Sequence, residues 1–302
     1  MSTPIINKII NAFNSGSCDK EIACFKNLET AINSVSCNIT AEIYHGAKSF
    51  VDFHPVSHPA PNWLGRLPAR CELADLLLIS YRKRPAFELR IAFLQAKYDK
   101  KKYKHPQCIN TIQFKADKKQ WYLLRYRPSI KAVKNNNSIP PNILSDAICS
   151  TVGAFIVFSK LNNNNNNIIF CAADNINPLN QQTTSRYVVF TTSLKCCGNK
   201  FRPCSQYIFN ENQISACTYG FISSLINVQI GTPIDPSTDT MTNGAAYDSR
   251  IWLAGVLDSI ANDQVNRKSL VQDLREALDI DNAPRITANT TKTILIIRND
   301  EE

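Results

Sequence analysis

The sequence predicts an α/β fold in which a mixed β-sheet is flanked by helices. Apolar residues at helical spacing open the chain, and two more helical segments lie near its end. Between them lie apolar runs rich in β-forming residues, separated by turn-forming residues. The chain has 302 residues and a hydrophobic share of 44%, which is enough for a packed core. We expect one domain over 1–302, with a core at approximately 17–134 and a C-terminal elaboration at approximately 135–302.

Two helices are expected before residue 50. The first is capped by Ser17 and carries apolar residues at helical spacing, namely Ile22, Phe25, Leu28 and Ile32. The second begins near Asn38, because residues 39, 42, 43 and 46 have the spacing of one helix face. Glu42 then lies on the inward stripe of this second helix.

Strands are expected from the alternation at 48–54 and from two apolar runs at 73–81 and 89–97. A basic turn at 82–85 joins these two runs, so they should form an antiparallel hairpin. The later elements are strands at 154–159, 168–172 and 187–192, helices at 251–261 and 269–278, and a final strand at 293–297. The asparagine runs at 135–137 and 162–167 are expected to be surface loops.

The composition favours an unexported, cytoplasmic protein. The first residues lack the pattern of a secretory signal, and no stretch approaches the ~20 apolar residues that cross a bilayer. The eleven cysteines are scattered and odd in number, so reduced, mostly buried thiols are expected. One cluster could hold zinc but lacks paired knuckle spacing, and ordinary packing is favoured there: Cys196, Cys197, Cys204 and Cys217.

The positive charge of the chain is concentrated in one segment. The net charge is +9, and residues 82–134 contain sixteen Lys or Arg against three acids, which leaves the remainder of the chain at −4. A local excess of this kind is typical of a surface that contacts nucleic-acid phosphates, whereas the alternative is a solvated lysine face. The predicted nucleic-acid-binding residues are Arg82, Lys83, Arg84, Lys100, Lys101, Lys102, Lys104, Lys118 and Lys119.

A group of polar residues lies at one end of the predicted hairpin. Asp75 opens the first strand, and Gln95 and Lys97 close the second. In an antiparallel hairpin the start of one strand lies beside the end of the other, so these residues should meet. The two-residue period of a strand puts Gln95 and Lys97 on the same face, with Ala96 on the other.

These residue types suit the hydrolysis of a phosphodiester. Mg²⁺ prefers oxygen ligands and retains positions for water and phosphate. The Asp75 carboxylate, the Gln95 amide and the Ala96 carbonyl can supply oxygen ligands. Lys97 can orient the attacking water or stabilise charge in the transition state. The basic segment continues directly from Lys97, so phosphate-binding charge adjoins the predicted metal site.

The segment from Glu42 to Lys97 resembles the PD-(D/E)xK restriction-endonuclease-like nuclease superfamily, and within it the Mrr-like subgroup that has Gln-x-Lys in place of Glu-x-Lys. The resemblance implies that Asp75 and Gln95 are metal ligands, that Lys97 is the catalytic lysine, and that Glu42 is the acid of the preceding helix. Ala74 stands where the motif has proline. Gln95 removes one negative charge, which weakens the expected hold on the metal.

The resemblance further implies a restriction-endonuclease-like fold and an endonuclease that uses Mg²⁺ (or Mn²⁺) to cut DNA in restriction or anti-phage defence. The expected partner is nucleic acid, DNA before RNA, and no membrane; a homodimer or a regulatory partner protein stays open. The alternative function is a non-catalytic nucleic-acid-binding subunit that retains the fold.

Other candidate sites are weaker. The proline between His54 and His58 prevents the helix that would align them as a metal pair. Trp121 and Tyr122 lie among basic residues and could stack on a base, but a core position is favoured. No cysteine sits at a glycine-rich turn with an evident histidine partner, and phosphate-loop and dinucleotide fingerprints are absent from the sequence.

Overall fold

The computed structural model describes most of the chain. The described residues are 3–35, 38–45, 49–56, 61–84, 86–103, 111–133, 139–180, 184–192, 215–234, 244–263, 269–278 and 293–299. Among them no helix has both the length and the apolar character needed to cross a membrane. The architecture is α/β, with a mixed central sheet between helices, as the sequence predicts.

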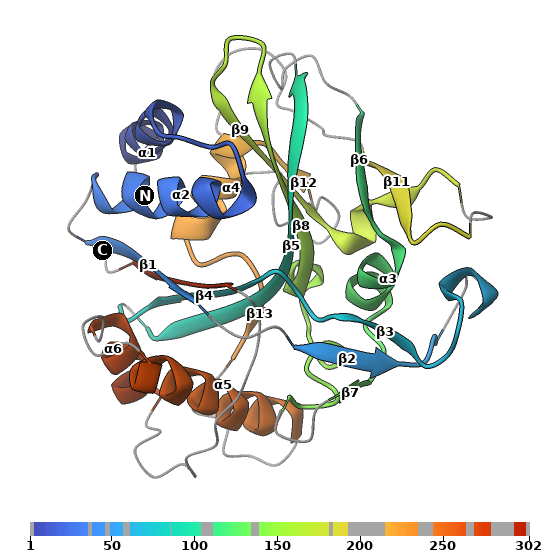
Figure 1. Cartoon of the computed structure of the whole chain (residues 1–302). Coiled ribbons are helices and arrows are strands. Elements are labelled where there is room, and N and C mark those ends of the chain that lie inside the picture. Colours follow the sequence, from blue (N-terminus) through green and yellow to red (C-terminus); the bar gives the residue numbers. More distant parts are fainter. Residues whose placement is uncertain are drawn as a thin grey trace.

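The central sheet takes strands from both ends of the chain (Figure 1). Its order is β1 (Ile39–His45), β14 (Thr293–Asn299), β4 (Leu76–Arg82), β5 (Glu88–Tyr103), β8 (Gly153–Leu161), β9 (Asn166–Ala172) and β12 (Ser215–Ala216), while the short β13 (Thr232–Pro233) also pairs with β5. The pairs β14–β4 and β5–β8 are parallel, and the others are antiparallel. Because β8, β9 and β14 belong to this sheet together with β1, β4 and β5, the segments before and after residue 134 form one sheet and not a core with a separate elaboration.

Each face of the sheet has its own hydrophobic core. Along β4, Leu76 and Leu78 belong to one core, whereas Leu77 and Ile79 belong to the other, as the two-residue period of a strand requires. The first core lies under α1 (Thr3–Ser15), α2 (Glu21–Asn33) and α4 (Thr218–Ile226). The second lies under α3 (Lys118–Tyr126), α5 (Gly244–Asp263) and α6 (Ser269–Ala277).

Two small sheets lie on the side of the second core. One has the order β3 (Ala69–Glu72), β2 (Phe50–Phe53), β7 (Ile130–Ala132), and the other β10 (Asn177–Pro178), β11 (Tyr187–Thr192), β6 (Ile112–Asp117). Short 3-10 helices are η1 (Pro61–Leu64), η3 (Ser150–Val152) and η4 (Ala173–Asn175). Trp121 and Tyr122 of α3 are buried between these layers, which confirms the core position favoured from the sequence.

The predicted second helix is wrong, because residues 39–45 form strand β1. Ile39, Ala41 and Ile43 are buried on alternate positions, so the apolar spacing satisfies a strand as well as a helix. Two side chains of α2 cover the outer edge of this strand. The Asn33 amide exchanges two hydrogen bonds of 2.8 Å with the Ala41 backbone, and Glu29 accepts from the Ile43 N–H at 2.8 Å. These contacts occupy backbone groups that an edge strand would otherwise expose.

The helix starts also differ from the prediction. α1 begins at Thr3, ahead of the expected first helix, and α2 begins after Lys20 without a side-chain cap. Ser17 therefore caps neither helix. The later helices and strands agree closely with the prediction: α5, α6, β8, β9, β11 and β14 each contain or nearly match the expected range.

The asparagine run at 162–167 is only partly a surface loop. Asn166 and Asn167 begin β9, and each is 2% exposed. The Asn166 amide donates to the backbone carbonyls of Phe13 and Gly16, and the Asn167 amide donates to the Ser159 hydroxyl at 3.0 Å. Asn166 thus ties the β8–β9 hairpin to the end of α1, and Asn167 ties β9 to β8, roles that the composition of the run does not reveal.

The expectation of reduced cysteines is wrong at one pair, because Cys18, which lies between α1 and α2, forms a disulfide with Cys24 of α2. The other cysteines among the described residues are Cys71, Cys149, Cys171 and Cys217. Burial raises the pKa of the Cys71 thiol, and raises the pKa of the Cys171 thiol to about 12. These two thiols are therefore protonated at neutral pH.

Two glycines with positive φ provide a test of how β13 packs on β5. At Gly231 φ is +99°, and an added Cβ would lie 2.3 Å from the Ile91 carbonyl oxygen, whereas at Gly65 φ is +79° and nothing lies within 4 Å. We expect Gly65→Ala to lower the free energy of unfolding by ~1–2 kcal/mol from the backbone conformation alone. Gly231→Ala should cost a further ~1–3 kcal/mol, because β13 must move away from β5. Urea denaturation measures both, and equal losses would contradict the close approach.

Candidate active site

The predicted hairpin forms and fixes the position of Asp75. β4 and β5 pair antiparallel with Leu76 opposite Leu94. Asp75 precedes β4 directly, and its backbone N–H donates to the Leu94 carbonyl at 3.1 Å. Its own carbonyl accepts from the Thr293 N–H at 3.2 Å. The backbone of Asp75 is thus held between β5 on one side and β14 on the other.

The Asp75 carboxylate contacts β5 just beyond the part of that strand that pairs with β4. Its Oδ2 accepts a hydrogen bond from the Ala96 N–H at 3.1 Å and lies 3.3 Å from the Lys97 Nζ. The side chains of Asp75 and Lys97 are 24% and 25% exposed, so solvent reaches this ion pair. An ion pair that is open to solvent contributes at most ~1 kcal/mol to stability. The pair therefore adds little to stability. Its importance is that it places a carboxylate beside an ammonium group, where both can take part in chemistry.

Gln95 is buried beside this pair. Its side chain is 0% exposed and lies on the same sheet face as Phe93 and Lys97. Neither amide atom has a hydrogen-bond partner among the described residues. A buried polar group without a partner costs ~1–3 kcal/mol. An amide oxygen held at this cost, on the residue that precedes Ala96, is available as a ligand.

Three residues here carry oxygen atoms of the types that a hard divalent cation accepts. The Ala96 N–H points from β5 toward Asp75, and in a strand the carbonyl of the same residue points to the same side. Asp75, Gln95 and Ala96 therefore offer a carboxylate, an amide oxygen and a backbone carbonyl, which are the ligand types of Mg²⁺. Among the described residues no group of three or more His, Cys, Asp or Glu side chains comes together. A cation here would have one anionic ligand.

Glu42 does not join this group. It lies on β1, opposite Ile296 of β14, and Ile296 in turn pairs with Ile79 of β4. Glu42 is therefore level with Ile79, which is four residues or ~13 Å along the strand direction from Asp75. It also lies two strands away from β4. Its carboxylate accepts a hydrogen bond from the Tyr44 hydroxyl. The helix that would have carried Glu42 inward is absent, so its predicted metal role lacks the geometry on which it depended.

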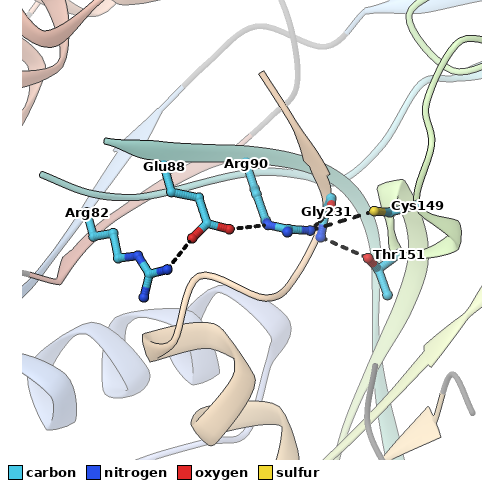
Figure 2. A network of polar contacts seen from close by, with 6 residues as sticks. All are labelled: Arg82, Glu88, Arg90, Cys149, Thr151 and Gly231. Carbon is cyan, nitrogen blue, oxygen red and sulfur yellow. Dashed lines mark hydrogen bonds and ion pairs between the residues drawn. The ribbon is translucent and has the colours of Figure 1, made fainter. Parts of the chain in front are cut away.

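Several basic residues of the 82–134 segment form ion pairs with acids of the same chain. Glu88 binds Arg82 at 2.7 Å and Arg90 at 2.9 Å, and Arg90 also donates to the Gly231 carbonyl at 3.1 Å (Figure 2). Lys83 lies 3.4 Å from Asp273. These contacts link the β4–β5 hairpin to β13 and α6. The charged groups of these residues therefore have partners within the fold and are not reserved for a ligand.

The charge at α3 is also partly internal. Lys118 is 4% exposed, with its Nζ 5.4 Å from the centre of the Trp63 ring, and burial lowers the pKa of this amine. The expectation that Lys118 is a surface phosphate contact is therefore wrong. Lys119 is half-buried and its N–H is held by Asp117 at 2.8 Å.

One group of exposed basic residues lies on the extension of β5. Lys100, Lys101 and Lys102 are exposed and follow Lys97 within the same strand. The Lys102 Nζ donates to Asn164 at 2.7 Å, in the turn between β8 and β9. Arg84 is also exposed, in the turn between β4 and β5, and Lys104 lies outside the described residues.

The weaker candidate sites are only partly covered by the described residues. His54 is exposed after β2, and His58 lies outside the described residues. Of the cysteine cluster, Cys217 stands at the start of α4, while Cys196, Cys197 and Cys204 lie outside the described residues.

Thr293 is the residue of the candidate site that the sequence did not predict. Its backbone N–H holds the Asp75 carbonyl from a strand far along the chain.

Comparison of the chain with family models, curated proteins and solved structures returned no match.

The buried amide of Gln95 gives a prediction about stability. Gln95→Met retains most of the side-chain volume and removes the unpartnered amide, so we expect it to raise the free energy of unfolding by ~1–3 kcal/mol in metal-free buffer. Asn167→Leu is the control, because it removes a buried amide that does have a partner and should be destabilising. Urea denaturation measures both. A loss of stability in Gln95→Met would mean that the amide makes contacts within the fold.

Proposed function

We propose that the chain is a divalent-metal-dependent nuclease with a restriction-endonuclease-like core formed by β4, β5 and their neighbours in the sheet. The observation that carries this proposal is the meeting of Asp75 with the Ala96 N–H and the Lys97 ammonium beside the unpartnered amide of Gln95. The antiparallel hairpin and the mixed sheet between helices are consistent with it. The proposed substrate is DNA, and the proposed setting is restriction or anti-phage defence in the cytoplasm.

The residues of the chain have separate roles in this mechanism. Asp75, Gln95 and Ala96 would hold Mg²⁺ or Mn²⁺ through oxygen atoms. Such an ion would supply Lewis acidity for the activation of water. Asp75 also accepts from the Lys97 ammonium, which keeps Nζ beside the proposed ligand carboxylate. From there Lys97 can orient the attacking water and then stabilise the negative charge that develops on the phosphate oxygens.

The exposed lysines of β5 would hold the substrate. Lys100, Lys101 and Lys102 follow Lys97 in one strand, and the ~3.3 Å rise per residue puts them within about 20 Å of it. A phosphate backbone crossing this extension would be directed toward Asp75. The internal ion pairs of Arg82, Lys83 and Arg90 leave this lysine row as the stronger candidate for phosphate contact.

A second candidate function is a non-catalytic nucleic-acid-binding subunit. One specific observation favours it: the site has one carboxylate, Asp75, and Glu42 is hydrogen-bonded to Tyr44 on a distant strand. A single anionic ligand binds Mg²⁺ more weakly than two. The two functions differ in whether purified protein cuts nucleic acid when a divalent cation is added.

Cleavage of plasmid DNA with Mg²⁺ or Mn²⁺ separates them. We expect Asp75→Asn to abolish cleavage although it retains an acceptor for the Ala96 N–H, because it removes the anionic ligand. Lys97→Met should reduce cleavage at least about 100-fold, in the range found when one electrostatic stabiliser is removed. Gln95→Glu should be tolerated or should raise activity at low metal concentration, because it adds a second anionic ligand.

Matched controls are available on the small β3–β2–β7 sheet. Asp52→Asn changes a carboxylate of similar exposure whose pKa is lowered by its hydrogen bond with Arg70, and Lys131→Met changes an exposed lysine. Both controls should leave cleavage unchanged. Cleavage that persists in Asp75→Asn and Lys97→Met would assign the chemistry to another site, and no cleavage by wild type or Gln95→Glu would favour the binding subunit.

Binding depends on the lysine row of β5 in this proposal. Replacing Lys100, Lys101 and Lys102 by Ser should weaken binding to duplex DNA and flatten its salt dependence by up to ~0.9 in the log–log slope for each phosphate that these lysines neutralise. The control replaces Lys8, Lys20 and Lys26, three exposed lysines of the α1–α2 region, and removes the same charge. Fluorescence anisotropy at several salt concentrations compares the two triple variants. Equal slopes would show that total charge, rather than the β5 row, determines binding.

A further inference from the structure

The small sheet β10–β11–β6 has an exposed outer face that none of the roles above uses. It lies on the flank of the molecule beside α3 (Figure 1). β11 is the central strand, and its residues alternate between the core and solvent. Val188 and Phe190 are buried, whereas Tyr187 and Val189 are 49% and 40% exposed. Leu179, whose N–H donates to the Val189 carbonyl, is 55% exposed beside them.

The inner side of this sheet anchors it firmly. The Phe190 ring lies 5.3 Å from that of Trp121, 6.3 Å from that of Phe114 and 6.4 Å from that of Phe155. Trp121 in turn donates from its indole to the Ile176 carbonyl next to β10. Aromatic contacts on one side thus hold the exposed residues of the other side in a fixed plane.

The outer face is positively charged. Lys115 of β6 is exposed and pairs with Val189 across the two strands. The Arg186 guanidinium lies 5.4 Å from the centre of the Tyr187 ring, and its side chain is 60% exposed. Within β6, β10 and β11 the one acid is Asp117, which is 2% exposed and bound to Arg186 at 2.6 Å. A ligand on this face therefore meets two cations, an aromatic ring and apolar side chains, but no exposed carboxylate from these strands.

We propose that the outer face of the β10–β11–β6 sheet binds single-stranded nucleic acid, with one base stacked on Tyr187. Bases of a single strand expose their faces, and aromatic side chains on a sheet can stack on them while nearby cations contact the phosphates. In a duplex the base faces are covered by their neighbours, so the same platform has little to hold. The inference adds a second surface to the proposed nuclease and shares with it only the premise that the ligand is nucleic acid.

Arg186 and Lys115 differ in what they contribute. Arg186 is held by Asp117 beside the Tyr187 ring, so its guanidinium is positioned to extend the stacking surface. Lys115 has no such anchor in the contacts described and sits across the strand from Val189, where it can follow a phosphate. In single-stranded nucleic acid bound here, bases would stack over Tyr187 and Val189, and the phosphate backbone would run along Lys115.

The test uses the full chain in EDTA, so that cleavage cannot interfere, with a labelled oligothymidylate of about 20 nucleotides and a duplex of equal length. We expect Tyr187→Ala to weaken binding of the single strand at least about five-fold, the lower end for loss of one stacked base, and to change duplex binding by less than about two-fold. Tyr187→Phe should retain the affinity of wild type, because it retains the ring. Lys115→Glu should weaken single-strand binding and lower its salt dependence.

Two controls test whether any exposed aromatic or lysine would behave in this way. Phe50→Ala removes a ring of 42% exposure on β2, and Lys131→Glu reverses an exposed lysine on β7. Both should leave single-strand affinity unchanged. An oligonucleotide containing 2-aminopurine should be quenched by wild type and by Tyr187→Phe but not by Tyr187→Ala, because stacking causes the quenching. Thermal melting checks that each variant is folded. If Tyr187→Ala does not fold, the single-strand affinity of Lys115→Glu tests the proposal.

Equal single-strand affinities of wild type, Tyr187→Ala and Lys115→Glu would overturn the proposal. An equal loss of single-strand affinity in Phe50→Ala would also overturn it. So would self-association that depends on Tyr187 without any change in oligonucleotide affinity, since the face would then bind protein. The proposed nuclease fails separately: single-strand binding that depends on Tyr187, in a chain that cuts nothing with Mg²⁺ or Mn²⁺, supports this surface and contradicts the enzyme.

Discussion

The register between β4 and β5 is the constraint on which the candidate site depends. With Leu76 opposite Leu94, Asp75 lies beside the residues of β5 that directly follow the paired segment. Its carboxylate accepts the Ala96 N–H in a place where a sheet would normally use a backbone carbonyl. A shift of one residue would turn Gln95 and Lys97 to the opposite face, under α1 and α2. The register is in turn fixed by burial, because both faces of β4 and β5 are packed against hydrophobic cores.

The strand that completes this arrangement comes from the end of the chain. β14 lies between β1 and β4, and the Thr293 N–H holds the Asp75 carbonyl at 3.2 Å. The site therefore requires a sheet built from both ends of the sequence. In contrast, Gln95 contributes no stabilising hydrogen bond among the described residues, although it is fully buried. A strongly supported backbone around one unsatisfied side chain is what a ligand site needs, since the fold holds the amide in place and the ligand satisfies it.

The hairpin and its polar end could be predicted from the sequence, because a tight turn between two apolar runs leaves few alternatives. The residues near Glu42 could not, since apolar positions 39 and 43 fit a helix face while 39, 41 and 43 fit a strand face, and the contacts of Asn33 and Glu29 that favour the strand are tertiary. The place of β14 was equally out of reach, because nothing local specifies a parallel neighbour. Net charge also predicted too large a basic surface: it does not distinguish Lys100, which is exposed, from Arg90, which pairs with Glu88.

Binding of Mn²⁺, measured by electron paramagnetic resonance of the free ion, decides whether the proposed metal site exists, because it does not depend on the identity of the substrate. We expect wild type to bind one Mn²⁺, Asp75→Asn to bind none in the same concentration range, and Gln95→Met to bind it more weakly while remaining folded. Asp52→Asn, which alters a carboxylate elsewhere, should bind as wild type does. Equal Mn²⁺ binding by wild type and Asp75→Asn would contradict the assignment of the site.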